Sequence, residues 1–266
     1  MIRVGSLFSG IGGMEIGLSR AIPDAVPVWF CEQNTFCQSI LSKHWQGVRI
    51  YNDVKNINKS NVEQIDILTG GFPCQSISVS GKMEGLENEE KSGLWWEMLR
   101  IIGDLRPRIV IMENVANIVR LGGCDVVGSL ARIGYDVEWE IVSARQFGAP
   151  HLRKRWFGVA YVADPVSPQS QNQSVDPVPT QRETFELYKY RVRENVSKRN
   201  ESNNRSGYWF TNPRPPRFCR VDDGISHRLA RLKALGNAIV PACSEYVGRC
   251  IVESGLIDDL ISGGEK

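Results

Sequence analysis

The sequence contains few of the residues that bind metal ions or build disulfide frameworks. Its three histidines, His44, His151 and His227, are far apart, and none of its seven cysteines belongs to a Cys-x-x-Cys pair. Structural zinc sites use closely spaced cysteines and histidines, whereas disulfide-rich domains use an even set of cysteines. We therefore expect free thiols and no bound metal.

Long apolar runs and a leader segment are also missing. The sequence has no run of about 18 apolar residues, the length that could cross a bilayer. Met1–Val4 fits the start of a strand and does not fit a signal peptide. With 266 residues, of which 42% are hydrophobic, the chain can bury one sizeable core and carry a small second lobe. We expect a soluble cytoplasmic protein without a membrane partner.

The net charge is only +2, but the basic residues are concentrated in one region. Residues 182–220 contain ten Lys and Arg against four Asp and Glu, so the rest of the chain carries a net charge of −4. Aromatic residues are interleaved with these cations, and a linker-like stretch rich in Pro, Ser and Gln precedes them. Such a mixture is typical of nucleic-acid binding, although a partly disordered insert would look similar.

A glycine-rich loop joins the first predicted strand, Ile2–Phe8, to a predicted helix over Met14–Ala21. Backbone N–H groups in such a loop can approach a ligand closely. A dinucleotide fingerprint would have a glycine where this chain has Glu15, which argues against NAD. Glu32 follows a second predicted strand, Val26–Phe30, at the spacing where a carboxylate can accept hydrogen bonds from ribose hydroxyls.

Cys74 follows a short apolar run, Ile65–Leu68, and the turn-forming residues Gly70, Gly71 and Pro73. A cysteine without other context is more commonly a small buried hydrophobic residue. Here two glycines and a proline would present it on a constrained loop at the end of a strand. The context therefore favours a functional thiol.

Two later features are predicted to lie near Cys74. Strand Ile109–Met112 is near-continuously apolar, and Glu113 follows at its carboxyl end, where parallel sheets build their sites. The cluster Arg153-Lys154-Arg155 supplies the positive charge that a reactive thiolate needs. We expect Cys74 and Glu113 to face one small substrate.

Five motifs, in this order along the chain, resemble the DNA (cytosine-5) methyltransferase family. They are Phe8-Ser9-Gly10-Ile11-Gly12-Gly13, Gly71-Phe72-Pro73-Cys74-Gln75, Glu113-Asn114-Val115, Arg153-Lys154-Arg155 and Gly236-Asn237-Ala238. The resemblance implies an α/β fold with a Rossmann-like, S-adenosylmethionine-dependent methyltransferase sheet and a small target-recognition lobe. We expect a cofactor-binding and catalytic domain over 1–163, a target-recognition region over 164–221, and C-terminal helices over 222–266 that return to the catalytic domain.

The resemblance also assigns the cofactor and its ligands. S-adenosyl-L-methionine would be bound by Phe8, Gly10, Gly12, Gly13, Glu32, Asp53, Pro73, Leu94 and Asn237. Asp53 would accept a hydrogen bond from the adenine amino group, but an aspartate at this position could as easily cap the next turn.

The predicted reaction is methyl transfer to carbon-5 of cytosine in a specific DNA sequence. Cys74 would add to carbon-6, Glu113 would bond the N3 edge, and Arg155 would hold O2. Arg153 would keep the thiol ionised or contact phosphate. The target base would be flipped out, because these atoms cannot be reached inside a stacked duplex.

Two alternatives remain at this point. A tRNA cytosine-5 methyltransferase could use the same cysteine and glutamate chemistry, and a non-catalytic, cofactor-sensing DNA-binding protein would need only the binding residues. The basic region favours double-stranded DNA as the partner. A cognate restriction endonuclease is a further candidate partner, and we expect a monomer.

Overall fold

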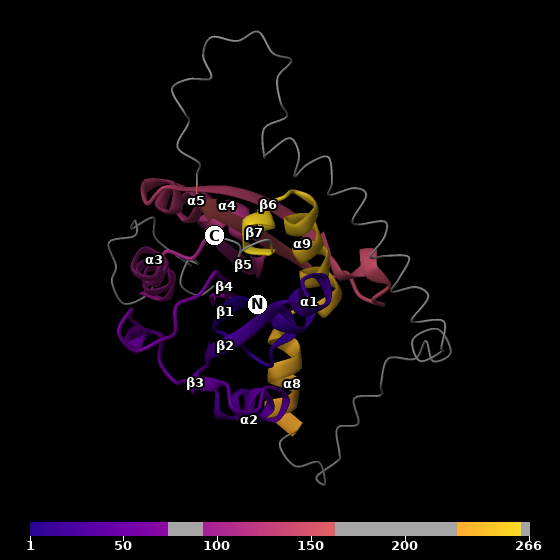
Figure 1. Ribbon diagram of the computed structural model, residues 1–266. Helices are drawn as coiled ribbons and strands as arrows, with labels where there is room; N and C mark the ends of the chain where they lie inside the picture. The colour runs from indigo at the N-terminus through magenta and orange to yellow at the C-terminus, as the bar shows by residue number, and fades with distance from the viewer. Residues whose placement is uncertain (74–92, 163–227, 262–266) are drawn as a thin grey trace, which may run out of the picture.

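The computed structural model describes residues 1–73, 93–162 and 228–261, and its core is one sheet of seven strands in the order β3-β2-β1-β4-β5-β7-β6 (Figure 1). The strands are β1 (Ile2–Leu7), β2 (Ala25–Cys31), β3 (Arg49–Tyr51), β4 (Ile67–Gly70), β5 (Ile109–Val115), β6 (Tyr135–Ser143) and β7 (Lys154–Val162). All neighbours are parallel except β7, which runs antiparallel to both β5 and β6. The predicted Rossmann-like methyltransferase sheet is confirmed.

The helices connect these strands and cover both faces of the sheet. They are α1 (Gly13–Ala21), α2 (Thr35–His44), α3 (Gly93–Leu105), α4 (Ile118–Leu121), α5 (Gly123–Arg132), α8 (Arg228–Asn237), α9 (Pro241–Glu253) and α10 (Asp258–Ile261), with short 3₁₀ turns η1 (Val54–Asn56) and η3 (Ala144–Phe147). No helix of the described residues is long and apolar enough to span a membrane.

The buried side chains form two cores, one on each face of the sheet. Helices α1 and α9 pack on one face, and α3 and α5 pack on the other. Strand β5 contributes to both cores, because successive side chains of a strand point to opposite faces. Ile109 and Ile111 belong to the α1/α9 core, whereas Val110 and Met112 belong to the α3/α5 core. This explains the continuous apolar run that predicted a buried strand.

Chain order changes direction between β1 and β4. After β3 the chain returns to the opposite side of β1, so the carboxyl ends of β1 and β4 flank a topological switch point. Open α/β sheets bind their ligands at such a point, outside the carboxyl ends of the strands. The glycine-rich loop follows β1 there, and Gly71 follows β4.

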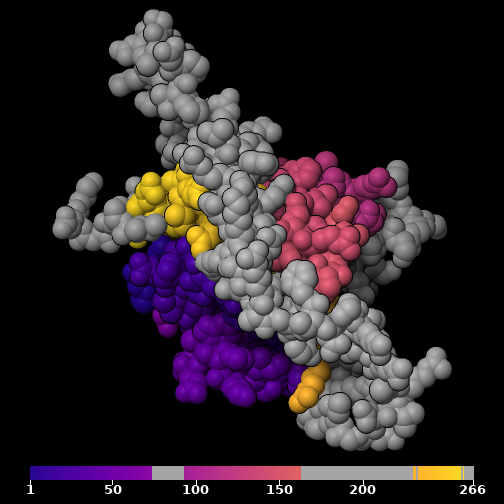
Figure 2. Space-filling view, turned by 90° about the vertical axis from the view of Figure 1, so that its right-hand side faces the viewer, coloured from indigo at the N-terminus to yellow at the C-terminus, as the bar shows by residue number. Residues whose placement is uncertain are grey.

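The C-terminal helix α9 packs closely against α1. A Cβ atom added at Gly17 of α1 would lie 2.0 Å from Ser244 Oγ and 2.2 Å from the carbonyl oxygen of Pro241. Figure 2 shows the same proximity, with the yellow C-terminal residues against the indigo N-terminal ones. Only a glycine allows the two helices to approach this closely.

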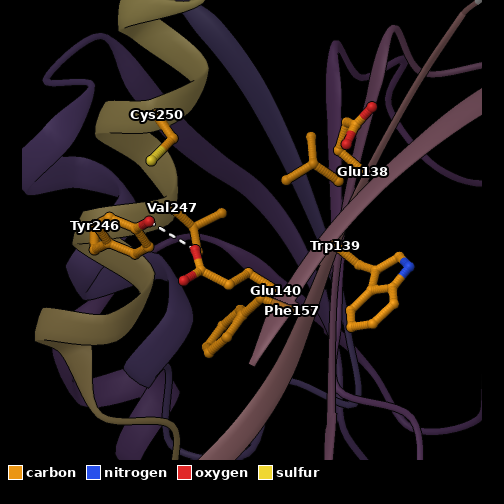
Figure 3. Close-up of a pocket in the computed structure, with 8 residues that line it drawn as sticks. Glu138, Trp139, Glu140, Phe157, Tyr246, Val247 and Cys250 are labelled. Atoms are coloured by element: carbon orange, nitrogen blue, oxygen red, sulfur yellow. Dashed lines mark hydrogen bonds between the residues drawn. The ribbon is translucent and has the colours of Figure 1, made fainter. Parts of the chain in front are cut away.

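Helix α9 also reaches the antiparallel end of the sheet. The Tyr246 hydroxyl donates a hydrogen bond of 2.7 Å to Glu140 Oε2 on β6, beside a small pocket that Phe157 and Cys250 help to line (Figure 3). One helix therefore spans the face from α1 to β6, and it ties the C-terminal region to both ends of the sheet.

Two element boundaries differ from the sequence-based prediction. Strand β5 continues to Val115, so Glu113 lies inside the strand and not at its end. The reason is the antiparallel partner β7, which begins at Lys154 and pairs Arg155 with Val115 beyond the end of β4. Helix α8 extends to Asn237, which was predicted to lie between two helices. The linker-like stretch and the basic region lie outside the described residues.

Candidate functional site

The loop after β1 has a left-handed backbone at several positions. Phe8, Gly10 and Gly12 have φ values of 54°, 55° and 80°. Gly12 also leaves no room for a side chain, because a Cβ there would lie 2.4 Å from the Trp45 ring. A Cβ at Gly13 would lie 2.3 Å from the carbonyl oxygen of Ile239. Gly12 and Gly13 therefore allow close packing, and Gly13 admits the backbone of the segment between α8 and α9.

Glu32 ties the glycine-rich loop to the end of β2. Its Oε2 accepts a hydrogen bond of 2.7 Å from the Gly10 amide, and its Oε1 accepts one of 2.8 Å from the Asn34 amide. The carboxylate is half-buried at the switch point of the sheet. Its position beside the loop matches the prediction from sequence spacing, and each oxygen has a second lone pair that a ribose hydroxyl could use.

Asp53 lies close to Glu32. Burial, together with the neighbouring carboxylates of Asp53 and Glu32, raises the pKa of the Cys31 thiol to about 12. Asp53 caps η1, because its Oδ1 accepts a hydrogen bond of 3.0 Å from the Lys55 amide. The capping role weighed from the sequence is therefore present. It leaves Oδ2 as the oxygen suited to an adenine amino group.

An apolar wall faces the same edge of the sheet. Phe8 and Leu94 pack against the α3/α5 core, which includes the buried Phe72. The Phe72 ring lies 5.0 Å from the Trp95 ring, between centroids. Pro73 follows as an exposed residue. Phe8, Leu94 and Pro73 are the members of this set with exposed surface, on which a flat heterocycle could stack.

Glu15, which occupies the place of the last glycine of a dinucleotide fingerprint, is buried under the loop. Its Oε1 accepts a hydrogen bond of 2.8 Å from Thr69 Oγ1, and no described residue hydrogen-bonds its Oε2. Burial raises the pKa of this carboxyl, which favours its neutral form. Glu15 thus links α1 to β4 and supports the loop from below.

Glu113 and Arg155 form a mostly buried ion pair at the carboxyl edge. Arg155 Nε lies 2.9 Å from Glu113 Oε1, and the two side chains are 23% and 11% exposed. They share a face of the sheet because Glu113 pairs with Phe157, which places Arg155 at the diagonal position. Burial raises the pKa of Glu113 to about 7, although Arg155 and then Arg153 lower it. Glu113 can therefore exchange a proton near neutral pH.

The segment that leads to Cys74 passes directly beside this pair. A Cβ added at Gly71 would lie 3.2 Å from Glu113 Oε2. Phe72 and Pro73 continue toward Cys74, which itself lies outside the described residues. The structure thus brings the predicted acid and the start of the predicted nucleophile loop together.

Asn114 is a residue of the site that the sequence reasoning did not single out. Its side chain is 2% exposed and points to the face opposite Glu113. Its Nδ2 donates a hydrogen bond of 3.0 Å to the Phe72 carbonyl, and its Oδ1 accepts one of 2.8 Å from the Val115 amide. Asn114 therefore fixes the segment two residues before Cys74. An asparagine that directly follows buried strand residues was the available signal, because buried amides need partners.

Arg153 contacts the backbone at the end of α8. Its Nη2 donates hydrogen bonds to the carbonyl oxygens of Gly236 and Ala238, at 2.9 Å and 2.5 Å. The guanidinium thus binds the end of α8, whose last residue Asn237 is exposed. Neither a thiol nor phosphate contact is needed to explain its position.

A second thiol, Cys243 on α9, lies near the ion pair. Burial raises the pKa of the Cys243 thiol. The charge of Arg153 lowers this pKa and that of Glu113 raises it, and the resulting value is about 12. A thiol with so high a pKa stays protonated at neutral pH and is a poor nucleophile.

A cleft of about 460 Å³ opens between α1, the turn after η3 and the segment between α8 and α9. Two of the predicted site residues, Gly13 and Arg153, line this cleft, and so does His151. Four other predicted site residues do not line it: Phe8, Glu32, Asp53 and Leu94. Glu32 and Asp53, two of the predicted cofactor residues, lie instead just after β2 and β3, and Glu32 contacts the glycine-rich loop.

Comparison with known proteins identifies the family. Residues 2–212 match the family model of the C-5 cytosine-specific DNA methylases. The chain belongs to this family. The resemblance found in the sequence motifs is thereby confirmed.

Curated methylases match about 60% of the chain. The type II methyltransferase M.CviJI of a Paramecium bursaria Chlorella virus is 38% identical over 164 residues, which are 61% of this chain and 44% of that protein. M.Bsp6I of a Bacillus species is 30% identical and matches 60% of this chain and 52% of its own length. The chain spans about half the length of the curated relatives that it matches.

Solved structures support the fold. The Schizosaccharomyces pombe Dnmt2 methyltransferase aligns with a TM-score of 0.61 and 18% identity, over 98% of this chain and 99% of that one. The Entamoeba histolytica methyltransferase EhMeth aligns with a TM-score of 0.59 and 16% identity, over the same shares. At these identities, the likeness concerns the methyltransferase fold.

Proposed function

We propose that this protein transfers a methyl group from S-adenosylmethionine to carbon-5 of cytosine in a specific sequence of double-stranded DNA. The observation that carries the proposal is the mostly buried Glu113–Arg155 pair beside the segment that leads to Cys74. Family membership gives this arrangement its reaction class. Ionisable groups with strongly shifted pKa values cluster at functional sites, and the raised pKa of Glu113 fits that pattern.

The residues around the switch point fit the cofactor. Adenosine offers ribose hydroxyls, which Glu32 can accept, and an adenine amino group, which Asp53 can accept. Phe8 and Leu94 supply an apolar wall, and the Gly10 loop allows close approach. When bound there, S-adenosylmethionine would supply an electrophilic methyl group on its sulfonium.

Carbon-5 of cytosine is too weak a nucleophile to react unaided, so the ring is first converted to an enamine. The Cys74 thiolate adds to carbon-6, and the displaced electron pair reaches N3, which takes a proton from Glu113. A Glu113 pKa near 7 suits this donor, since its protonated form is populated at neutral pH. Arg155, which is paired with Glu113, would bond the cytosine O2 in this scheme.

The later steps reverse these changes. Carbon-5 takes the methyl group, a base removes the proton from carbon-5, and Cys74 leaves as a thiolate while N3 returns its proton to Glu113. The base is a water molecule in this scheme. Because Glu113 lies on the sheet edge and is mostly buried, the cytosine must be flipped out of the duplex to reach it.

We further propose that residues 164–221 choose the DNA sequence, as their basic and aromatic composition suggests. They lie outside the described residues. A cognate restriction endonuclease is a partner that would suit this function, since curated relatives are type II methyltransferases. The DNA methylase family model favours duplex DNA over tRNA as the substrate.

The decisive experiment compares two cysteine variants on duplex DNA and tRNA, with labelled S-adenosylmethionine. Cys74→Ser should abolish methyl transfer, because the thiolate forms the bond to carbon-6. Cys243→Ala should keep methyl transfer within about twofold of wild type, because its thiol stays protonated.

A duplex that contains 5-fluorocytosine tests the covalent step. Wild type and Cys243→Ala should both be trapped, since fluorine blocks the final elimination, and Cys74→Ser should not. Trapping of the Cys74→Ser variant would show that another residue is the nucleophile. Transfer to tRNA without transfer to duplex DNA would identify the tRNA enzyme instead.

A further inference from the structure

Arg153 has a backbone conformation that an L-residue rarely adopts. Its φ is 32°, and it lies immediately before β7, in the turn that also contains the exposed His151. A non-glycine residue in this region is strained, and it persists only where surrounding contacts hold it. The contacts of Arg153 should therefore explain why the conformation is kept.

Those contacts are the two carbonyl groups that flank Asn237. Arg153 Nη2 donates to the carbonyl oxygens of both Gly236 and Ala238. The last carbonyl groups of a helix have no partner within the helix, and the partial negative charge there attracts a cation. Arg153 therefore caps the carboxyl end of α8 from a part of the chain more than eighty residues away.

The segment that Arg153 holds lies between the two halves of the site. The Ile239 carbonyl packs on Gly13, at the start of α1. The Ile239 side chain reaches toward Gly71, where a Cβ would lie 3.8 Å from Ile239 Cδ1. Ile239 thus touches both the glycine-rich loop and the segment that leads to Cys74. A shift of this segment would change both.

We propose that Arg153 is a positioning residue, which sets the segment Asn237–Val240 against the cofactor site and does not contact DNA phosphate. The proposal rests on the proposed function, because it assumes that the edge near Gly13 binds S-adenosylmethionine. It reassigns Arg153, which the motif resemblance placed among the catalytic residues. Arg155 keeps its role beside Glu113.

The test measures binding of S-adenosylmethionine to the full chain by calorimetry, without DNA. Arg153→Met should lose about tenfold or more in affinity, the equivalent of the hydrogen bonds that order the segment. Lys154→Met is the matched control, since it removes the same charge from an exposed neighbour and should change affinity by less than about twofold. Arg153→Lys, which can still reach one carbonyl, should be intermediate.

Kinetics and DNA binding separate this role from the alternatives. In Arg153→Met the KM for S-adenosylmethionine should rise about tenfold, whereas kcat at saturating cofactor should fall by less than about threefold. The slope of DNA affinity with salt should match that of Lys154→Met. Unchanged cofactor affinity in Arg153→Met would overturn the proposal. So would a plot of log DNA affinity against log salt concentration that is less steep than that of Lys154→Met by about one, because it would indicate a phosphate contact.

Two outcomes keep this proposal distinct from the proposed function. If wild type itself fails to bind S-adenosylmethionine, the proposed function fails. If wild type binds it and Arg153→Met binds it equally well, only the positioning role fails. Should Arg153→Met not fold, Arg153→Lys decides the question, because a folded lysine variant with wild-type affinity and KM contradicts the role.

Discussion

Two glutamates at the same edge of the sheet, Glu32 and Glu113, have very different surroundings. Glu32 is half-buried and accepts hydrogen bonds from two backbone amides. Glu113 is mostly buried and is paired with the guanidinium of Arg155. The first carboxylate is held by main-chain geometry, whereas the second is held by a side chain of opposite charge.

This difference suits Glu32 to ligand binding and Glu113 to proton transfer. A carboxylate anchored by amides serves as a fixed acceptor, because the amides hold its oxygens in place. Burial works against the charge of Glu113 and raises its pKa to about 7, and Arg155 offsets only part of that effect. Glu113 can therefore give and take a proton in the neutral range. The comparison predicts different consequences for removing charge at each place.

The largest expected effect is that of Glu113→Gln on turnover. Glutamine can donate a hydrogen bond to N3 but cannot transfer a proton, so methyl transfer should fall by about 10²–10⁴-fold. In wild type, the protonated form becomes scarce as the pH rises above about 7, so the rate should decline there. The rate of Glu113→Gln should lack this decline. Equal decline of both proteins above neutral pH would assign it to another group.

A smaller effect is expected on folding when Arg155 is replaced by methionine. Removing one partner of a buried pair leaves the other unpaired, which should cost about 3 kcal/mol of unfolding free energy at pH 8. At pH 6 the cost should shrink, because Glu113 then takes up a proton.

The sign of this pH dependence follows from the raised pKa of Glu113. A carboxyl whose pKa is higher in the folded state binds its proton more tightly there, so stability falls as the pH rises through that value. Denaturant unfolding at both pH values measures it, with Lys154→Met as the control. The same loss at pH 6 and pH 8 would show that Glu113 is not the group left unpaired.

The smallest expected effect is that of Glu32→Gln on cofactor binding. The neutral amide loses the charge-assisted bonds, and affinity for S-adenosylmethionine should weaken by about 2 kcal/mol. Glu63→Gln removes an equal charge from an exposed residue and should leave affinity unchanged. Calorimetry on the two variants makes the comparison. If they bind the cofactor equally well, Glu32 is not the ribose ligand.

Much of the cofactor edge could be predicted from local sequence. The glycine-rich loop between a buried strand and a helix, and Glu32 about twenty residues after it, depend on short-range patterns that survive without knowledge of the fold. These features can be predicted because neighbouring residues determine the burial of a strand and the geometry of a loop.

The catalytic edge depends on contacts between distant segments. Strand β5 extends past β4 only because β7 pairs with it, and this pairing places Arg155 diagonally from Glu113. The reach of Asn114 to Phe72 spans 42 residues, and that of Arg153 to Gly236 spans 83. No local pattern records which carbonyl a distant side chain will find.

The sequence by itself therefore determined the family, the alternating strands and helices, and the residue types available at the sheet edge. Only the tertiary structure decided the electrostatics of Glu113, because burial and the distance to Arg155 arise when separate strands come together. It also decided the partner of Arg153, since the orphan carbonyls of α8 attract whichever cation the packing of α9 on α1 brings near.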